Sequence, residues 1–215
     1  MRSLYKTILF DFDGTVFDTG KGIMKSVQYA AQQFGYDEPD WTALRSFVGP
    51  PLVESFMRRY NVDEEKAKAM TAKYRERYSE HGLDECSAYP GVIELVRYLR
   101  STGTPVAIAT GKPTAFTVEI LRRNGVLDEF DDVLGSEFDG TRSHKWETIE
   151  LLLDKFGRED AVMVGDRDND VNAAKHCNIP CVGVSWGYAV PGELVSAGAI
   201  AVADNVEELK NILIR

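Results

Sequence analysis

Short, continuous apolar runs alternate with helical patterns through most of the chain. Apolar runs without polar alternation are typical of strands that are covered on both faces of a parallel sheet. We read six strands, TILFDFD, PVAIATG, DDVLGSE, AVMVGD, CVGVSWG and, more weakly, AIAVAD. Between them lie the helical patterns GVIELVRYLRSTG, AFTVEILRRNG and KWETIELLLDKFG, and each closes on a glycine, a frequent residue at helix C-termini. This alternation predicts an α/β fold with a doubly wound, Rossmann-like parallel sheet.

One section, residues 18–87, breaks the alternation, because it contains helical patterns and no convincing strand. IMKSVQYAAQQFG and DEEKAKAMTAKYRERYSEHG each carry an apolar stripe, and VGPPL separates two shorter helices. We expect Asp63 to cap the second long helix, and Met70, Tyr74 and Tyr78 to pack inside the insert. SAYPG is the expected return linker. The predicted organisation is an α/β core of residues 1–17 and 88–215, interrupted by a helical insert at 18–87.

The amino-acid composition limits the classes of protein to which the chain can belong. The 215 residues are 44% apolar and 27% charged, which suits a packed globular chain. The formal net charge of -9 argues against a nucleic-acid polymer as partner, whereas a small anionic substrate remains compatible because a metal can outweigh the global charge. We expect no membrane association, since no apolar run is long enough to cross a bilayer. We expect no signal peptide, because the N-terminal MRSLYKTILF has only a short apolar stretch that leads straight into aspartates.

The cysteines and histidines do not have the spacing of a zinc site. Cys86, Cys177 and Cys181 lack the spacing of a metal site, so we expect reduced thiols in a cytoplasmic protein, the last two of them in the core. The three histidines are scattered along the chain.

The polar residues that carry chemistry follow the predicted strands. Ligands of an open parallel sheet bind beyond the carboxyl ends of its strands. Those ends hold Asp11 and Asp13 after the first strand, Thr110, Gly111 and Lys112 after the second, and Asp166, Asp168 and Asp170 after the fourth, while Lys145 opens the helix before that fourth strand. A single carboxylate at a strand end could be a helix cap. Acids, a hydroxyl and a lysine at several strand ends are harder to explain in that way.

The acids predict a metal site. Residues two apart on an extended chain face the same side, so Asp11 and Asp13 can address one centre, and Asp166 and Asp170 bring the number of carboxylates to as many as four. Two such charges 4 Å apart repel by about 4 kcal/mol at an effective dielectric of 20, so the cluster needs a cation. Oxygen ligands without histidine or cysteine favour Mg²⁺. A hydroxyl and an ammonium nearby suit a phosphate dianion.

These residues carry a family resemblance. In this order, DFDGT, ATGK, Lys145 and GDRDND resemble the four motifs of the haloacid dehalogenase-like hydrolase superfamily, over essentially the whole chain. The helical insert resembles the cap of the phosphoglycolate phosphatase-like branch, in which the cap selects the substrate. FVGPPLVESF, YPGV, GSEFDGTRSHK, VMVGDRDNDV and GVSWGY are similar to a bacterial group described as 5'-nucleotidases or phosphoglycolate phosphatases.

The resemblance implies a role for each motif residue. Asp11 would be the nucleophile that forms an aspartyl-phosphate, and Asp13 would protonate the leaving oxygen and then deprotonate the attacking water. Asp11, the main-chain carbonyl of Asp13 and Asp166 would hold Mg²⁺, with Asp170 near or in the outer shell. Thr110 and the Gly111 amide would bind the phosphoryl oxygens, Lys145 would offset the nucleophile's charge, and Gly14 would let the chain turn over the metal.

Other positions are open to two interpretations. Arg45 is a candidate contact for a second anionic group of the substrate, although a surface arginine is the more ordinary interpretation. We expect Lys112 to be solvated, Asp168 to cap a helix, and Asp18 to be structural. Arg142, His144, Trp186 and Tyr188 lie near the motifs without an assigned role, and His144 is expected in an exposed loop. Asn178 and Ala189 replace glycines that relatives often have, and asparagine tolerates left-handed backbone.

The predicted function is a Mg²⁺-dependent phosphatase of the 5'-nucleotidase or phosphoglycolate phosphatase type, acting on a small phosphorylated metabolite as a monomer or homodimer. Two alternatives remain open: a phosphosugar mutase of the same superfamily, and a non-catalytic phosphometabolite-binding protein. A binding protein would have no use for the proton transfer of Asp13.

Overall fold

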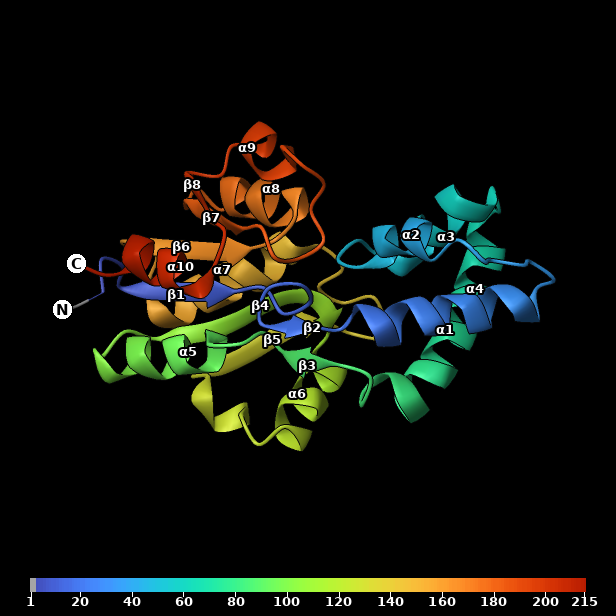
Figure 1. The fold of residues 1–215 in the computed structure, drawn as a ribbon, viewed down its shortest axis with the longest axis horizontal. Coiled ribbons are helices and arrows are strands. Elements are labelled where there is room, and N and C mark those ends of the chain that lie inside the picture. Colours follow the sequence, from blue (N-terminus) through green and yellow to red (C-terminus); the bar gives the residue numbers. More distant parts are fainter. Residues whose placement is uncertain (1–2) are drawn as a thin grey trace. The chain divides into compact units, whose positions relative to one another are not determined.

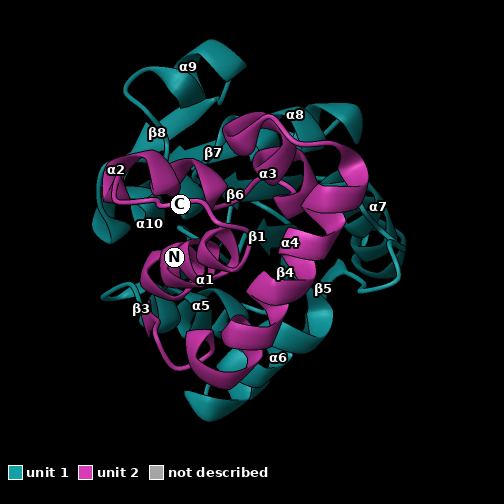
Figure 2. Cartoon of the chain, turned by 90° about the vertical axis from the view of Figure 1, so that its right-hand side faces the viewer, with its two compact units in different colours: residues 1–17, 88–215 teal, residues 18–87 magenta. Residues whose placement is uncertain are grey.

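The computed structural model describes residues 3–215, which fall into two compact units. Unit 1 consists of the described residues of Met1–Phe17 and Ala88–Arg215, and unit 2 is Asp18–Ser87 (Figure 2). The chain leaves unit 1 at the two-residue strand β2 (Phe17–Asp18) and returns at β3 (Ser87–Ala88), and these two strands pair. Such short strands leave no apolar pattern, so the prediction of a section without strands was wrong at its two ends.

Unit 1 is built on a parallel sheet of six strands in the order β5-β4-β1-β6-β7-β8 (Figure 1). Its strands are β1 (Thr7–Phe10), β4 (Val106–Pro113), β5 (Asp132–Ser136), β6 (Ala161–Gly165), β7 (Cys181–Val184) and β8 (Ala201–Ala203). Its helices are α5 (Val92–Ser101), α6 (Thr114–Arg123), the short η3 (Leu127–Glu129), α7 (Lys145–Phe156), α8 (Asp168–His176), α9 (Glu193–Ala197) and α10 (Val206–Leu213). The predicted doubly wound α/β fold is confirmed.

The central strands are buried on both faces, which explains their continuous apolar runs. Leu9 of β1 and Met163 of β6 pack in one cluster with Leu152 of α7 and Val171 of α8. Consecutive residues of a strand point to opposite faces of the sheet. The residues that alternate with Leu9 and Met163 therefore pack on the other face. Cys177 and Cys181 are buried core residues, as expected.

The strand order determines where the functional residues meet. β1 lies between β4 and β6, with Phe10 paired to Ile108 on one side and to Val164 on the other. The chain runs outward from β1 through β4 to β5 and then returns to β6, so the direction of winding reverses beside β1. Ligand sites of doubly wound sheets lie at this reversal, beyond the carboxyl ends of the strands.

Unit 2 is helical. It contains α1 (Gly20–Gln33), α2 (Trp41–Leu44), η1 (Arg45–Phe47), α3 (Leu52–Tyr60), α4 (Glu64–Arg77) and the π-helical turn η2 (Tyr78–Gly82). Asp63 caps α4 as predicted, since its Oδ1 accepts a hydrogen bond of 2.8 Å from the Lys66 amide. Met70, Tyr74 and Tyr78 are buried, also as predicted, and the rings of the two tyrosines stack with centroids 5.3 Å apart. Among residues 3–215, no helix is both long and apolar enough to span a membrane.

Candidate active site

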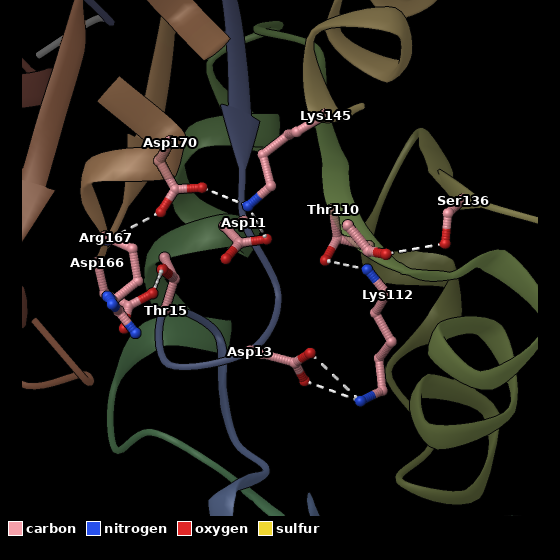
Figure 3. A network of polar contacts seen from close by, with 11 residues as sticks. Asp11, Asp13, Thr15, Thr110, Lys112, Ser136, Lys145, Asp166, Arg167 and Asp170 are labelled. Carbon is pink, nitrogen blue, oxygen red and sulfur yellow. Dashed lines mark hydrogen bonds and ion pairs between the residues drawn. The ribbon is translucent and has the colours of Figure 1, made fainter. Parts of the chain in front are cut away.

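Three buried carboxylates meet at the carboxyl edge of the sheet of unit 1 (Figure 3). Asp11 follows β1, Asp166 follows β6, and Asp170 lies in the first turn of α8. One oxygen from each lies within 4.8 Å of the others, and no side chain of the three is more than slightly exposed. Sequence positions far apart thus converge on one point, because β1 and β6 are neighbours in the sheet.

Lys145, the first residue of α7, supplies a cation to this cluster. Its Nζ lies 2.8 Å from Asp11 Oδ1 and also contacts Asp170 Oδ1. Burial raises the pKa of Asp11 to about 7, and the neighbouring Asp170 carboxylate adds to the rise, while Lys145 opposes it. Burial likewise raises the pKa of Asp166 well above its ordinary value. Burial alone would lower the pKa of Lys145, but the carboxylates of Asp11 and Asp170 outweigh it and raise the pKa.

The cluster fits a divalent cation. Three carboxylates and one ammonium leave two negative charges, which a divalent ion would neutralise. Asp11 Oδ1 is buried and accepts no aligned hydrogen bond, although Lys145 Nζ is near, so it has a lone pair to offer. The donors are all hard oxygens, which suit Mg²⁺ better than zinc.

Two glycines let the backbone close around Asp166. A Cβ on Gly14, whose φ is +84°, or on Gly187 would lie 2.2 Å from Asp166 Oδ2. No side chain fits there without displacing the carboxylate. The positive φ and the close approach give Gly14 a physical reason to be glycine.

Asp166 is also held by partners to which the sequence assigned no such role. Thr15 Oγ1 donates a hydrogen bond of 3.2 Å to Oδ1, and the Tyr188 amide donates one of 2.7 Å to Oδ2. Trp186 belongs to the same arrangement, because its Nε1 donates to the Thr15 carbonyl at 3.2 Å. The only sequence signal for Thr15 was its place at the end of DFDGT.

We expect Thr15→Val to weaken Mg²⁺ binding by about 10-fold, because removal of a hydrogen bond that orients a ligand typically costs 10–100-fold in metal affinity. Isothermal titration with Mg²⁺ measures this. Thr148→Val is the matched control, since Thr148 is fully buried and its hydroxyl makes no hydrogen bond. Equal affinities in the two variants would show that the Thr15 hydroxyl does not orient Asp166.

Asp13 lies outside the carboxylate cluster. Its two oxygens accept from Lys112 Nζ at 3.0 and 3.3 Å, and Lys112 is only 7% exposed. The prediction of a solvated Lys112 was therefore wrong. The expected group of up to four carboxylates is a group of three, with Asp13 neutralised separately.

Thr110 and Gly111 stand at the end of β4, beside Asp11. Thr110 is 1% exposed, and its Oγ1 accepts from the Lys112 amide at 3.2 Å. The Gly111 carbonyl accepts from Ser136 Oγ at 2.8 Å. A buried hydroxyl and a fixed backbone at this edge are compatible with phosphate contact.

The helix cap was predicted on the wrong aspartate. Arg167 is the N-cap residue of α8, and Asp170 Oδ2 accepts its amide hydrogen at 2.9 Å. Asp168 is exposed, and its amide donates to Glu193 Oε1 at 3.0 Å. Asp170 thus contacts both the helix terminus and the lysine of the carboxylate cluster.

The remaining candidates are not members of the carboxylate cluster. Arg45 belongs to unit 2, in η1, and is exposed, while Asp18 accepts from the Gly20 amide at 3.2 Å. Arg142 donates through Nε to the Gly135 carbonyl at 2.8 Å and pairs with Glu137. His144 is exposed, as expected. Asn178 adopts the left-handed conformation that was predicted, with φ of 55°.

A doubly wound sheet with buried carboxylates at its carboxyl edge places the chain among the α/β enzymes that bind ligands beyond their strand ends. The model of the family described as "Haloacid dehalogenase-like hydrolase" matches residues 8–184. The chain belongs to this family, and the predicted resemblance is confirmed.

Individual relatives include a 5'-nucleotidase, phosphoglycolate phosphatases and a tyrosine-protein kinase. The chain is 42% identical to a 5'-nucleotidase of Pseudomonas aeruginosa, over 88% of this chain and 87% of the other. It is 32% identical to tyrosine-protein kinase PtkA of Mycobacterium tuberculosis, over 96% of this chain and 72% of the other, and 26–28% identical to phosphoglycolate phosphatases of three Vibrio species, over 97–100% of this chain and 96–99% of theirs. The crystal structure of a "predicted phosphatase" from Clostridium acetobutylicum superimposes with a TM-score of 0.93 at 39% identity, covering 98% of both chains.

Proposed function

We propose that the chain hydrolyses a small-metabolite phosphomonoester with the help of Mg²⁺, through a phosphorylated Asp11. The family match and the phosphatase-named relatives make it a phosphoric monoester hydrolase. The observation that carries the mechanism is the position of Asp11, buried beside two further carboxylates and 2.8 Å from Lys145.

In the proposed first step, an Asp11 oxygen attacks phosphorus in line with the leaving oxygen. Lys145 lowers the repulsion between this carboxylate and the phosphate, and the Thr110 hydroxyl and Gly111 amide orient the phosphoryl oxygens. Mg²⁺, held by Asp11, Asp166 and the main-chain carbonyl of Asp13 with Asp170 nearby, would supply positive charge for the phosphoryl group.

Asp13 would move the protons. It protonates the leaving oxygen as the first step proceeds, and then accepts a proton from the water that hydrolyses the aspartyl-phosphate. Its separation from the carboxylate cluster supports this division of labour, because a carboxylate side chain that does not hold the metal remains a stronger proton acceptor.

We further propose that unit 2 carries the residues that select the substrate, with Arg45 as the first candidate, and that the reaction takes place in the cytoplasm. Nucleoside monophosphates and phosphoglycolate are the two candidate substrates, by resemblance and by the names of the relatives.

The test is phosphate release from a panel of phosphomonoesters, with Mg²⁺ and with chelator. The panel contains nucleoside monophosphates, phosphoglycolate, hexose phosphates and pyrophosphate. We expect one class to be preferred and chelation to lower its turnover by about 100-fold, equivalent to roughly 3 kcal/mol of transition-state stabilisation. Added Mg²⁺ should restore it.

The other outcomes are informative. Turnover that survives chelation would exclude the metal-assisted mechanism. A folded chain that binds Mg²⁺ and releases no phosphate from any panel member would favour the mutase or the binding protein. Arg45→Ala should change the order of preference within the panel if Arg45 selects the substrate.

A further inference from the structure

Lys112 and Asp13 form a second charged pair in the active site of unit 1. Lys112 Nζ contacts both oxygens of Asp13, at 3.0 and 3.3 Å. The two side chains are only 4% and 9% exposed, so water competes little for either. Figure 3 shows the pair apart from Lys145 and its carboxylates, with the side chains of Asp13 and Lys112 pointing toward each other.

The backbone holds Lys112 in this place. The pairing of β4 with β5 is irregular between Ala109 and Pro113, and such irregularities redirect side chains at strand ends. A Cβ on Gly135 would lie 2.0 Å from the Lys112 carbonyl oxygen, so β5 approaches closely only because this residue is glycine. Ser136 Oγ also donates to the Gly111 carbonyl at 2.8 Å. The neighbouring strand therefore supports the segment from which Lys112 reaches Asp13.

We infer that Lys112 is a positioning residue for Asp13, which it holds ready to accept the proton of the hydrolytic water. The inference rests on the proposed phosphatase mechanism. An ammonium bonded to both oxygens restrains the rotation of the carboxylate, and a proton acceptor must be held within hydrogen-bond reach of its water. Removing the ammonium takes away the contact that both oxygens of Asp13 make with Lys112 Nζ, so the carboxylate would be less restrained.

The step that Lys112 assists is the second one. Water oxygen attacks the phosphorus of the aspartyl-phosphate, the bond between phosphorus and the Asp11 oxygen breaks, and inorganic phosphate leaves. The proton of the water passes to Asp13. In the first step Asp13 instead gives a proton to the leaving oxygen. The contact with Lys112 does not promote that donation, because both oxygens of Asp13 accept hydrogen bonds in it.

The experiment is rapid-mixing kinetics of the Mg²⁺-loaded chain with p-nitrophenyl phosphate, whose leaving group needs little protonation. For Lys112→Met we expect kcat to fall about 10-fold, kcat/KM to change by less than about 3-fold, and a burst near one p-nitrophenolate per chain to appear as aspartyl-phosphate accumulates. Lys112→Arg should recover part of kcat, because it restores the cation.

A double-mutant comparison separates positioning from other roles. If Lys112 acts through Asp13, adding Lys112→Met to Asp13→Asn should change kcat by less than about 2-fold. A full additional loss in the Asp13→Asn background would overturn the inference. A raised KM with unchanged kcat would also overturn it, and would make Lys112 a substrate-binding cation. A drop of kcat without a burst, shared by Lys112→Arg, would indicate a structural role only.

Measurements on the wild-type chain distinguish a failure of the proposed function from a failure of the role inferred for Lys112. A wild-type chain without chelator-sensitive turnover overturns the proposed function and the role of Lys112 together. An active wild-type chain with an unaffected Lys112→Met variant overturns the role of Lys112 alone.

Discussion

Asp11→Asn should lower phosphate release by at least about 10⁴-fold, because an amide oxygen cannot take the place of the attacking carboxylate. The measurement is turnover of the preferred phosphomonoester at saturating Mg²⁺, together with acid-quench detection of covalent phosphate on the chain. The variant should carry no covalent phosphate. Asp168→Asn is the matched control, since Asp168 is an exposed acid of the last motif and lies outside the carboxylate cluster.

The same variant should keep or gain stability, which separates loss of the nucleophile from loss of the fold. Burial raises the pKa of Asp11 from its ordinary value of 3.8 to about 7, so ionised Asp11 destabilises the folded, metal-free chain. That penalty is absent below pH 3.8 and grows as the pH rises toward 7. Lys145 keeps Asp170 as a partner after the substitution.

Thermal melts in chelator test this second part. We expect the melting temperature of Asp11→Asn to exceed that of the wild type by more at pH 8 than at pH 5. A variant that is inactive and also melts lower at both values would mean that Asp11 is needed for the fold, and the activity result would no longer identify a nucleophile.

Asp13→Asn should lower kcat by about 10³-fold on an alkyl phosphomonoester and leave the affinity for inorganic phosphate within a few-fold of the wild type. Asparagine is close in size to aspartate but cannot transfer the proton. With p-nitrophenyl phosphate, the first step should persist and give a burst followed by slow turnover. Steady-state kinetics, rapid mixing and phosphate titration provide the three readouts.

Asp18→Asn is the control for Asp13→Asn. Asp18 is an exposed acid of the same segment, and an asparagine oxygen can still accept the hydrogen bond from the Gly20 amide. Near-normal turnover in Asp13→Asn would exclude the acid and base roles of Asp13. An equal loss in Asp18→Asn would attribute the effect to the segment as a whole.

Most of the α/β architecture could be predicted from local patterns. A strand buried on both faces needs a continuous apolar run, so β1, β4 and β6 were readable one at a time. The acids were readable because they directly follow these runs, and the rule that parallel strands bind ligands at their carboxyl ends brought them together. The family resemblance then supplied roles that spacing alone does not imply.

Contacts between side chains could not be predicted from local sequence patterns. Lys112 and Asp13 are 99 positions apart, and Thr15 and Asp166 are 151 apart. Their contacts depend on β4 and β6 being the two neighbours of β1, and on the irregular end of β4. From the sequence alone, a lysine at a strand end is expected to be solvated. Its burial can be predicted only when the neighbouring strand in the sheet is known.

The amino-acid sequence by itself determined the six strands of the parallel sheet, the helices of the inserted section and the acids and lysine of the candidate site, because each depends on interactions within a few residues. Tertiary structure alone decided which carboxylates lie together in the candidate metal site, which one is paired with Lys112, and how Asp166 is held by Thr15 and the Tyr188 amide. The physical reason is that charge compensation and hydrogen bonding inside a protein depend on distance in space, and the sheet order sets that distance.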